Sequence, residues 1–169
     1  MNLTVYDDAV PYDIRSNIYY FSCRSTLQLG WKDHQFNDVG DINLHSKWTQ
    51  EDLVNCGLWK YMEECIKLTP WFTKTTFKQC VLNLVRAPDV HLIHSHGSEY
   101  AVLYYVNLEW RDGWYGETLF YSEDAKDVVF TSPFVPGRMM LFDGIIPHTI
   151  RPQSTIAPKY RLTISTFFV

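Results

Sequence analysis

The chain has 169 residues and a formal net charge of −4, with 46% hydrophobic and 16% aromatic residues. This length fits one domain that buries a single core. The acidic balance provides no basic footprint for a nucleic acid, and the aromatic content favours a fold rich in β-strands. No segment approaches the roughly 18 consecutive apolar residues of a membrane span. Residues 1–13 lack the basic and apolar stretches of a secretory signal, so we expect a cytoplasmic protein.

The first 74 residues predict a supporting region of strands, turns and one helix. Residues 16–29 are rich in β-formers, and residues 36–46 are rich in turn-formers around Gly40. The best predicted helix covers residues 49–68, where Thr49 can cap the first turn and Gly57 weakens the middle. Its apolar residues recur at roughly helical spacing: Leu53, Leu58, Met62 and Ile66.

The remainder of the chain, about residues 75–169, predicts a β-rich core. Short aromatic or β-branched segments alternate with turn residues, at 75–86, 100–110, 117–122, 127–133, 138–144, 148–153 and 160–169. Short strands at intervals of about 8–12 residues are typical of a sandwich or barrel, and a jelly roll protects many strand edges. We therefore predict a single domain over residues 1–169, mainly β with flanking helices.

The four cysteines indicate free thiols rather than a cross-linked or zinc-binding framework. They are Cys23, Cys56, Cys65 and Cys80, and no two of them form a CxxC pair. This spacing is that of neither a zinc ribbon nor a disulfide framework. We expect reduced and mostly buried cysteines.

Three histidines form a candidate metal site. His94 and His96 lie two residues apart where a strand is predicted to begin, so their imidazoles should face the same way. His148 lies far downstream in the segment FDGIIPHTIRP, and separate strands of a sandwich can bring it to the same place. An iron(II) oxygenase site normally combines two histidines with one carboxylate. By itself the spacing also fits ordinary surface histidines.

Two further segments carry candidate ligand-binding residues. Arg161 interrupts an apolar strand with Thr163 on the same face, and a buried arginine needs a carboxylate partner. A dicarboxylate such as 2-oxoglutarate would supply one, and a surface Asp or Glu is the alternative. Tyr105 shares its strand face with Ala101 and Leu103, so its hydroxyl can reach a ligand or simply fill the core.

Six segments in order resemble the iron(II)/2-oxoglutarate-dependent dioxygenases, in their prolyl-4-hydroxylase-like branch. They are HSH (94–96), LYYVNLEW (103–110), WYGETLFY (114–121), PGRMMLFDG (136–144), PHTIRP (147–152) and YRLTISTFF (160–168). Each is weak alone, but six in order over about ninety residues are specific. Residues 1–75 carry no such resemblance.

The resemblance implies a double-stranded β-helix, or jelly roll, that binds Fe(II) at its open end. His94 and His148 match the first and last metal ligands. Arg161 matches the residue that holds the far carboxylate of 2-oxoglutarate, with Thr163 and Tyr105 as its neighbours. The polar neighbours Asn83 and Asn107 are further candidates for the cosubstrate pocket. The aromatic residues Trp110, Trp114, Tyr115 and Phe120 are candidate substrate contacts.

The sequence departs from the family pattern at two positions. His96 stands where the family has Asp or Glu, and Tyr115 replaces the first glycine of a Gly-Gly-Glu-Thr turn. We expect His96 to bind the metal, with Glu99, across the Gly97–Ser98 link, or Asp89 as the alternative carboxylates. Asp89 forms a reversed pair with His91 just upstream.

The resemblance implies an oxygenase that uses iron(II) and 2-oxoglutarate to hydroxylate an unactivated C–H bond of a peptide or a small molecule. A jelly-roll protein that binds a metal or ligand without catalysis is the first alternative. A three-histidine oxygenase that does not use 2-oxoglutarate is the second. The substrate and the oligomeric state do not follow from the sequence.

Overall fold

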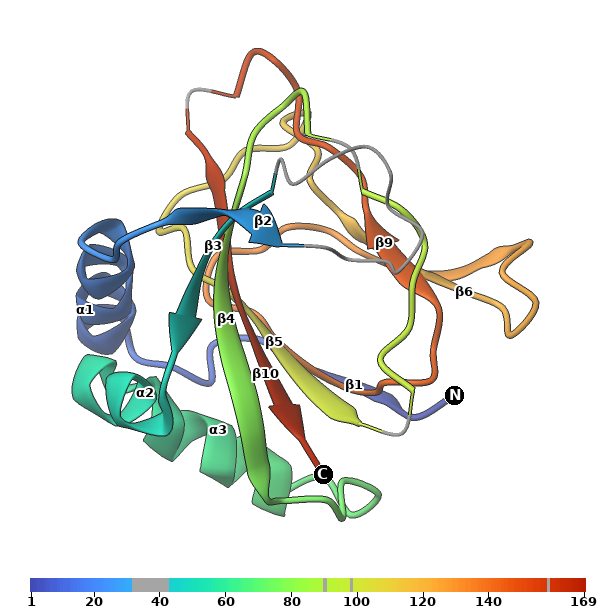
Figure 1. The fold of residues 1–169 in the computed structure, drawn as a ribbon, viewed down its shortest axis with the longest axis horizontal. Coiled ribbons are helices and arrows are strands. Elements are labelled where there is room, and N and C mark those ends of the chain that lie inside the picture. Colours follow the sequence, from blue (N-terminus) through green and yellow to red (C-terminus); the bar gives the residue numbers. More distant parts are fainter. Residues whose placement is uncertain (32–42, 90, 98, 158) are drawn as a thin grey trace.

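The computed structural model describes residues 1–31, 43–89, 91–97, 99–157 and 159–169, and in these ranges the chain forms two antiparallel sheets with three helices (Figure 1). The strands are β1 (Leu3–Tyr6), β2 (Gln28–Trp31), β3 (Asn43–Trp48), β4 (Phe77–Val85), β5 (Tyr100–Tyr105), β6 (Thr118–Tyr121), β7 (Val128–Ser132), β8 (Met139–Asp143), β9 (His148–Ile150) and β10 (Arg161–Phe168). The helices are α1 (Tyr12–Cys23), α2 (Gln50–Cys56) and α3 (Leu58–Lys67).

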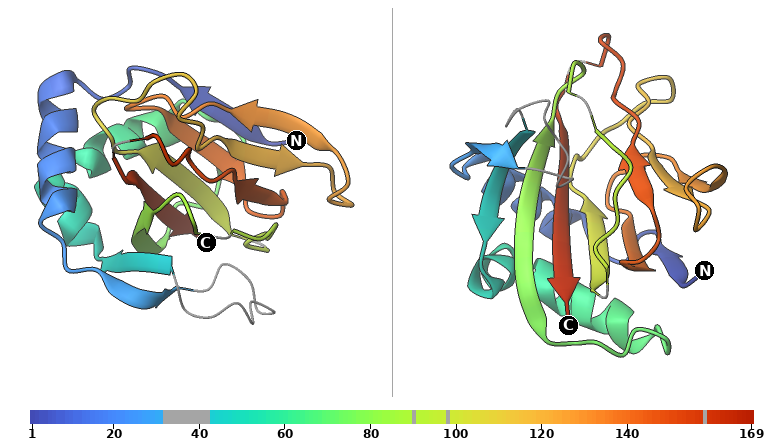
Figure 2. Two further views of the ribbon diagram at one scale, coloured as in Figure 1. Left: turned by 90° about the horizontal axis from the view of Figure 1, so that it is seen from above. Right: turned by 45° about the vertical axis from the view of Figure 1, so that its right-hand side comes forward.

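The two sheets differ in size and face each other. The larger sheet has the order β1-β8-β5-β10-β4-β3-β2, and the smaller one has the order β7-β6-β9. The helices pack on the outer face of the larger sheet, and the smaller sheet lies opposite its inner face (Figure 2). The predicted fold class, mainly β with flanking helices in a jelly roll, is confirmed. The predicted strands from residue 75 onward correspond to β4 through β10.

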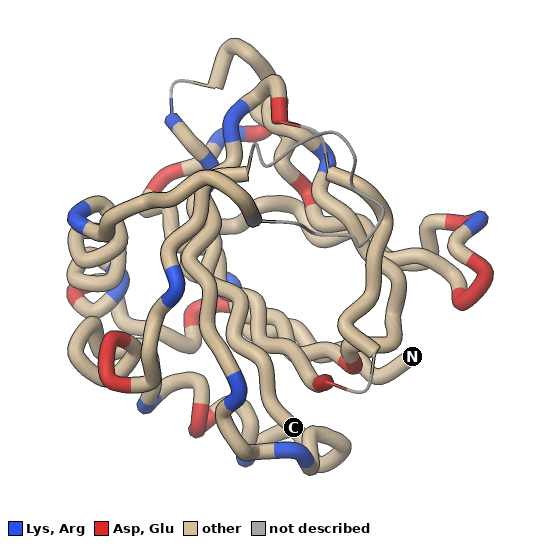
Figure 3. Tube along the Cα trace, in the orientation of Figure 1, with Lys and Arg blue, Asp and Glu red and all other residues tan. Residues whose placement is uncertain are grey.

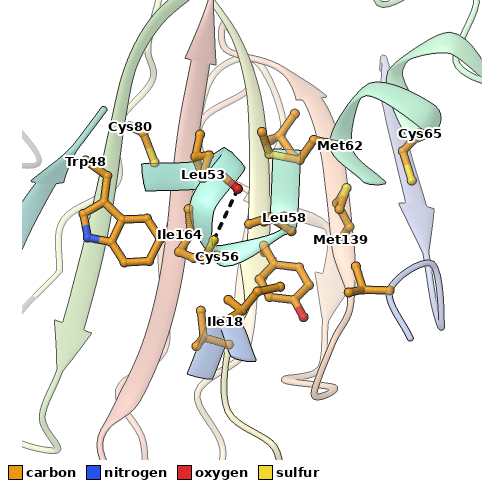
Figure 4. Close-up of a cluster of buried hydrophobic side chains, with 14 of the residues drawn as sticks. Ile18, Trp48, Leu53, Cys56, Leu58, Met62, Cys65, Cys80, Met139 and Ile164 are labelled. Carbon is orange, nitrogen blue, oxygen red and sulfur yellow. Dashed lines mark hydrogen bonds between the residues drawn. The ribbon is translucent and has the colours of Figure 1, made fainter. Parts of the chain in front are cut away.

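Strand alternation divides the buried residues into two cores. Along β10, Ile164 and Phe168 face the helices, whereas Phe167 faces the smaller sheet. The core beneath the helices contains Leu53, Leu58 and other residues drawn in Figure 4. The second core lies between the sheets, beside the candidate site. The inner faces of β4, β5, β8 and β10 therefore determine which side chains reach that site.

The prediction of β-structure for residues 16–29 is wrong for most of that range. Helix α1 covers its first part, and only its end enters β2. Ile14, Ile18 and Phe21 recur at helical spacing and pack against the core under the larger sheet. This packing outweighs the β-preference of the neighbouring aromatic residues. Residues 36–42 of the predicted turn-rich segment lie outside the described residues, and β3 begins directly after them.

The helix predicted for residues 49–68 is two helices. Thr49 caps α2 as expected, because its hydroxyl accepts a hydrogen bond from the Asp52 amide and its own amide donates to the Asp52 carboxylate. Gly57 ends α2 with a φ of +90°, a left-handed conformation that favours glycine. A Cβ at Gly57 would also lie 3.2 Å from Cγ2 of Ile14 on α1. The break therefore lets α3 turn and follow the sheet.

All four cysteines are free, which confirms the prediction of unpaired thiols. Cys56, Cys65 and Cys80 are buried, whereas Cys23 is exposed. Burial raises the pKa of the Cys80 thiol to about 12 and that of the Cys56 thiol to about 11. The buried thiols are therefore protonated core residues at neutral pH.

Among the described residues, no helix is both long enough and apolar enough to cross a membrane. The three helices are short and lie against the sheet.

Candidate metal centre

A cavity of about 60 Å³ lies between the inner face of the larger sheet and strand β9. Its walls come from β3, β4, β5, β8, β10 and the segment that precedes β5. Three histidines contribute to its lining, together with polar side chains from the sheet: Asn43, Asn83, His91, Thr118, Thr163 and Ser165. No Asp, Glu, Lys or Arg is among the described residues that line it.

His94, His96 and His148 converge in this cavity. The ring centroids are 5.0 Å apart for His94 and His96, 4.5 Å for His94 and His148, and 5.0 Å for His96 and His148. One nitrogen of each ring lies within 4.8 Å of those of the other two. The described part of the chain contains no carboxylate in this group. The site is therefore a cluster of three imidazoles that can hold one metal ion.

Backbone pairing brings the three histidines together. The His94 amide donates to the His148 carbonyl at 3.0 Å, and the His148 amide donates to the His94 carbonyl at 2.9 Å. The His96 amide donates to the Gly144 carbonyl at 2.7 Å. His94 and His96 precede β5 rather than lying within it, but this extended pairing still places both rings on one side. The prediction that they face the same way is confirmed.

The ring orientations suit metal binding. Nδ1 of His94 lies 3.0 Å from the Leu92 carbonyl oxygen, and Nδ1 of His148 lies 2.9 Å from the Ile146 carbonyl oxygen. A proton on each Nδ1 can be donated to that oxygen, which leaves Nε2 as the metal-binding atom. Burial, together with the nearby His94 and Lys78, lowers the pKa of His96 to about 3. His96 is therefore neutral near pH 7, the form that binds metals.

Gly144 allows the two ligand-bearing segments to approach closely. Its amide donates to the Glu99 carbonyl at 2.8 Å. A Cβ at this position would lie 2.3 Å from the same oxygen and 3.1 Å from Cβ of His96. Backbone cannot move aside as a flexible side chain can, so any other residue here would displace the His96 segment.

The alternative carboxylates are engaged elsewhere. Glu99 forms an ion pair with Lys78 on β4. Asp89 forms an ion pair with Arg86 at 2.8 Å and also accepts a hydrogen bond from the Arg86 amide. Ser98, in the link that was expected to bring Glu99 to the metal, lies outside the described residues. The geometry favours His96 over both acids.

We therefore expect Glu99→Gln to leave metal affinity unchanged, because Glu99 is outside the imidazole cluster. The substitution removes the charge of the Lys78 ion pair, which is partly exposed and should alter stability by less than about 1 kcal/mol. Titration of the metal-free protein with cobalt(II), followed by absorption, measures the affinity. Loss of cobalt binding in Glu99→Gln, with retention in His96→Ala, would identify Glu99 as the ligand instead.

Arg161 is the fully buried cation beyond the cavity. Its side chain has 0% exposure at the beginning of β10. Nε donates to the Gly116 carbonyl at 2.8 Å, and one terminal nitrogen, Nη2, donates to Oγ1 of Thr118 at 3.1 Å. The other terminal nitrogen, Nη1, is buried and has no hydrogen-bond partner among the described residues. Burial lowers the pKa of Arg161, so a carboxylate at Nη1 would relieve an electrostatic cost.

Thr118 connects Arg161 with Tyr105 and the cavity. The Tyr105 hydroxyl and Oγ1 of Thr118 are 2.7 Å apart, and Thr118 itself lines the cavity. Tyr105 is thus directed at a protein hydroxyl, and its predicted contact with a cosubstrate carboxylate stays a prediction. Thr118 was not named among the sequence-based candidates, although it lies within the quoted segment WYGETLFY (114–121).

The remaining cosubstrate candidates separate into two groups. Thr163 and Asn83 both line the cavity, and the Asn83 amide donates to the Ser165 hydroxyl at 3.3 Å. Asn107 instead donates to the Tyr160 carbonyl and accepts from the Leu162 amide, so it fixes the start of β10. Ser165 is a cavity residue that the sequence analysis did not identify.

Tyr115 occupies a position suited to glycine. Its φ is +58°, in the left-handed region, which explains why the family turn has glycine there. The Arg151 guanidinium lies 3.7 Å from the centre of the Tyr115 ring and 3.6 Å from the Glu117 carboxylate. Arg151 is partly exposed and thus secures the outside of the turn that carries Thr118.

Two of the aromatic residues expected to contact substrate are in different surroundings. Phe120 is fully buried between the sheets and packs against the rings of Phe142 and His148, so it is a core residue and not an exposed contact. Tyr115 is exposed and stacks with Arg151.

Solved structures resemble this chain along almost its whole length. A prolyl hydroxylase from Trichoplax adhaerens, in complex with a hypoxia inducible factor oxygen degradation domain peptide fragment, has a TM-score of 0.70 and 14% identity over 99% of this chain and 83% of that chain. A Pseudomonas putida prolyl-4-hydroxylase has a TM-score of 0.70 and 13% identity, over 99% and 91%. The protein has the fold of the 2OG-Fe(II) oxygenases.

Another structure with this fold was solved with a metal ion and 2-oxoglutarate. HygX from Streptomyces hygroscopicus, with nickel and 2-oxoglutarate bound, has a TM-score of 0.69 and 9% identity over 99% of this chain and 82% of that chain. No protein-family model matches the sequence, and no curated protein sequence matches it either. The likeness is therefore one of three-dimensional structure.

Proposed function

We propose that the protein is an iron(II)- and 2-oxoglutarate-dependent oxygenase that hydroxylates an unactivated C–H bond of a peptide or small molecule. The observation that carries this proposal is Arg161: its guanidinium is completely buried beside the rings of Tyr105 and Phe134, and its Nη1 has no hydrogen-bond partner among the described residues. It lies one side chain behind Thr118, on the wall of the cavity that contains the three histidines. Arg161 lies behind the cavity residue Thr118 and the metal site lies within the cavity, an arrangement that suits a dicarboxylate.

Each described residue has a distinct part in this proposal. His94, His96 and His148 hold the metal ion, and the carbonyls of Leu92 and Ile146 orient two of the rings. When bound, iron(II) and 2-oxoglutarate would supply the oxidising chemistry, as cofactors do in such enzymes.

Side chains of both sheets would hold 2-oxoglutarate. Arg161 pairs with the far carboxylate of 2-oxoglutarate. Thr163 and Asn83 lie along the wall between that end and the metal. Tyr105 and the Gly116 carbonyl hold Thr118 and Arg161 in place. The rings of Phe142 and Phe167 line the metal end and exclude water from it.

Anaerobic loading with iron(II), with and without 2-oxoglutarate, tests the proposal. We expect a visible charge-transfer absorption band only when both are present, and succinate once oxygen is admitted. Iron binding without a 2-oxoglutarate band would favour a three-histidine oxygenase that does not use 2-oxoglutarate. Binding of both without succinate, across peptide and small-molecule candidates, would favour a binding protein without catalysis.

A further inference from the structure

We infer that the metal-loaded cavity contains a binding position for one additional monovalent anion. This inference rests on the proposed metal site and deepens it. It arises from the charge of the residues around the three histidines, and it identifies a chemical property of the substrate or of a second ligand.

The ligand set leaves the site with an uncompensated positive charge. Three imidazoles are neutral donors, so a divalent metal keeps both of its charges. Arg161 adds a third positive charge, and 2-oxoglutarate removes two. One positive charge then remains, whereas a carboxylate in place of His96 would cancel it.

No carboxylate of a described residue lines the cavity, and Glu117, which acts electrostatically on Arg161, is paired with Arg151 at 3.6 Å. Glu99 is paired with Lys78, and Asp89 with Arg86. Asp143 follows Phe142, which lines the cavity, so strand alternation directs Asp143 to the other face. In Figure 3, most charged residues lie on the helices and connecting turns. The charge must therefore be balanced by a bound ligand.

The cavity walls suit a small anion. The hydroxyls of Thr163 and Ser165 and the amide of Asn83 can donate hydrogen bonds without adding charge. Ala101, Leu103 and Phe167 make the surroundings apolar, which strengthens charge interactions. An anion with a single negative charge would accept hydrogen bonds from these donors and cancel the one remaining positive charge.

Two sources can provide the same chemistry. A free halide is one source, and a carboxylate group of the substrate is the other. Both place one negative charge beside the metal, and both differ from an uncharged peptide segment. Chloride and acetate are therefore the natural probes, together with azide as a spectroscopic reporter.

The test measures anion binding to the cobalt(II)-loaded protein through its visible spectrum, in the presence of 2-oxoglutarate, because the excess charge is counted with both ligands bound. We expect azide to bind the parent protein at least about tenfold more tightly than His96→Asp, because one unit of charge close to the metal is worth more than about 1.4 kcal/mol in a poorly solvated site. The control is Ser95→Asp, which adds the same charge at an exposed neighbouring position. It should remain within about twofold of the parent, since solvent screens it.

A second variant keeps all three ligands. Ser165→Asp adds a negative charge inside the cavity and should weaken azide binding as His96→Asp does. It keeps the inference testable if His96→Asp no longer binds cobalt. Equal azide affinity in the parent and in either cobalt-binding cavity variant overturns the inference. Failure of the parent to bind cobalt overturns both this inference and the proposed metal site.

The remaining arms separate the two sources and the two proposals. Tighter binding of chloride than of acetate indicates a free halide, and the reverse indicates a substrate carboxylate. If iron(II) and 2-oxoglutarate produce their absorption band, but azide affinity is the same in the parent and in the cavity variants with an added Asp, only the anion inference fails. If azide binds as expected but no band forms, only the use of 2-oxoglutarate fails.

Discussion

Replacement of Arg161 by alanine is expected to weaken 2-oxoglutarate binding by about 30-fold to several thousand-fold, with little change in iron affinity. Loss of one partner of a buried, charge-assisted pair costs roughly 2–5 kcal/mol. The guanidinium is completely buried, lies behind the cavity residue Thr118 and is outside the cluster of three imidazoles. Calorimetric titration of the anaerobic iron(II) protein with 2-oxoglutarate measures the effect.

Arg151→Ala is the matched control for that experiment. Arg151 is the other arginine near the turn that holds Thr118, but it is partly exposed and interacts with Tyr115 and Glu117. Its removal should change 2-oxoglutarate affinity only modestly. Unchanged affinity in Arg161→Ala, or a larger loss in Arg151→Ala, would assign the cosubstrate to another cation.

Arg161→Met, which fills about the same volume, separates the effect of Arg161 on 2-oxoglutarate binding from its effect on protein stability. In the ligand-free protein, the stability of Arg161→Met should stay within about 2 kcal/mol of the parent, because removal of a buried charge offsets the loss of the hydrogen bonds to Gly116 and Thr118. Urea denaturation measures this. A loss of several kcal/mol would make Arg161 a structural residue and count against its role in cosubstrate binding.

Replacement of His148 by alanine is expected to abolish stable iron binding. The cluster would keep only His94 and His96, and no carboxylate among the described residues is placed to take over. Loss of one of three ligands from a site with the proposed geometry should lower the affinity by at least about 100-fold, an effect larger than the 10–100-fold of an outer partner. Metal analysis after anaerobic loading and desalting measures the occupancy.

The stability of His148→Ala needs a separate measurement. His148 is only 6% exposed and lies beside the rings of Phe120 and Phe142. The cavity left by alanine should therefore cost about 2–3 kcal/mol. His91→Ala, which removes a cavity histidine outside the cluster, should retain iron. Equal iron in His148→Ala and the parent would exclude His148 as a ligand.

The jelly-roll core could be predicted because each of its strands carries its own local signal. Alternation along β10 separates Ile164, which packs under the helices, from Phe167, which packs between the sheets. Turn residues separate the strands, so the existence of each strand followed from the sequence, although β5 ends at Tyr105 and β9 at Ile150, earlier than predicted. The histidine pair and His148 were recognisable because motif order links segments that backbone pairing later brings together.

The N-terminal helix and several site residues required three-dimensional information. The aromatic residues of α1 favour strands locally, and only packing against the sheet makes the helix favourable. Thr118 matters because it lies between Arg161 and Tyr105, which are far from it in sequence. Gly144 matters because another backbone segment passes beside it. No local pattern encodes such contacts.

A metal ion bound by His94 and His148 would cross-link two backbone segments that already pair with each other. These residues are joined by two backbone hydrogen bonds, and among the described strands β9 pairs only with β6. An ion held by both imidazoles would have to be released before this pairing could open. Binding at 100 times the dissociation constant adds about 2.7 kcal/mol to stability. The amides of His94 and His148 should accordingly exchange with deuterium far more slowly in the loaded protein, while those of β4 and β10 are already protected by the sheet.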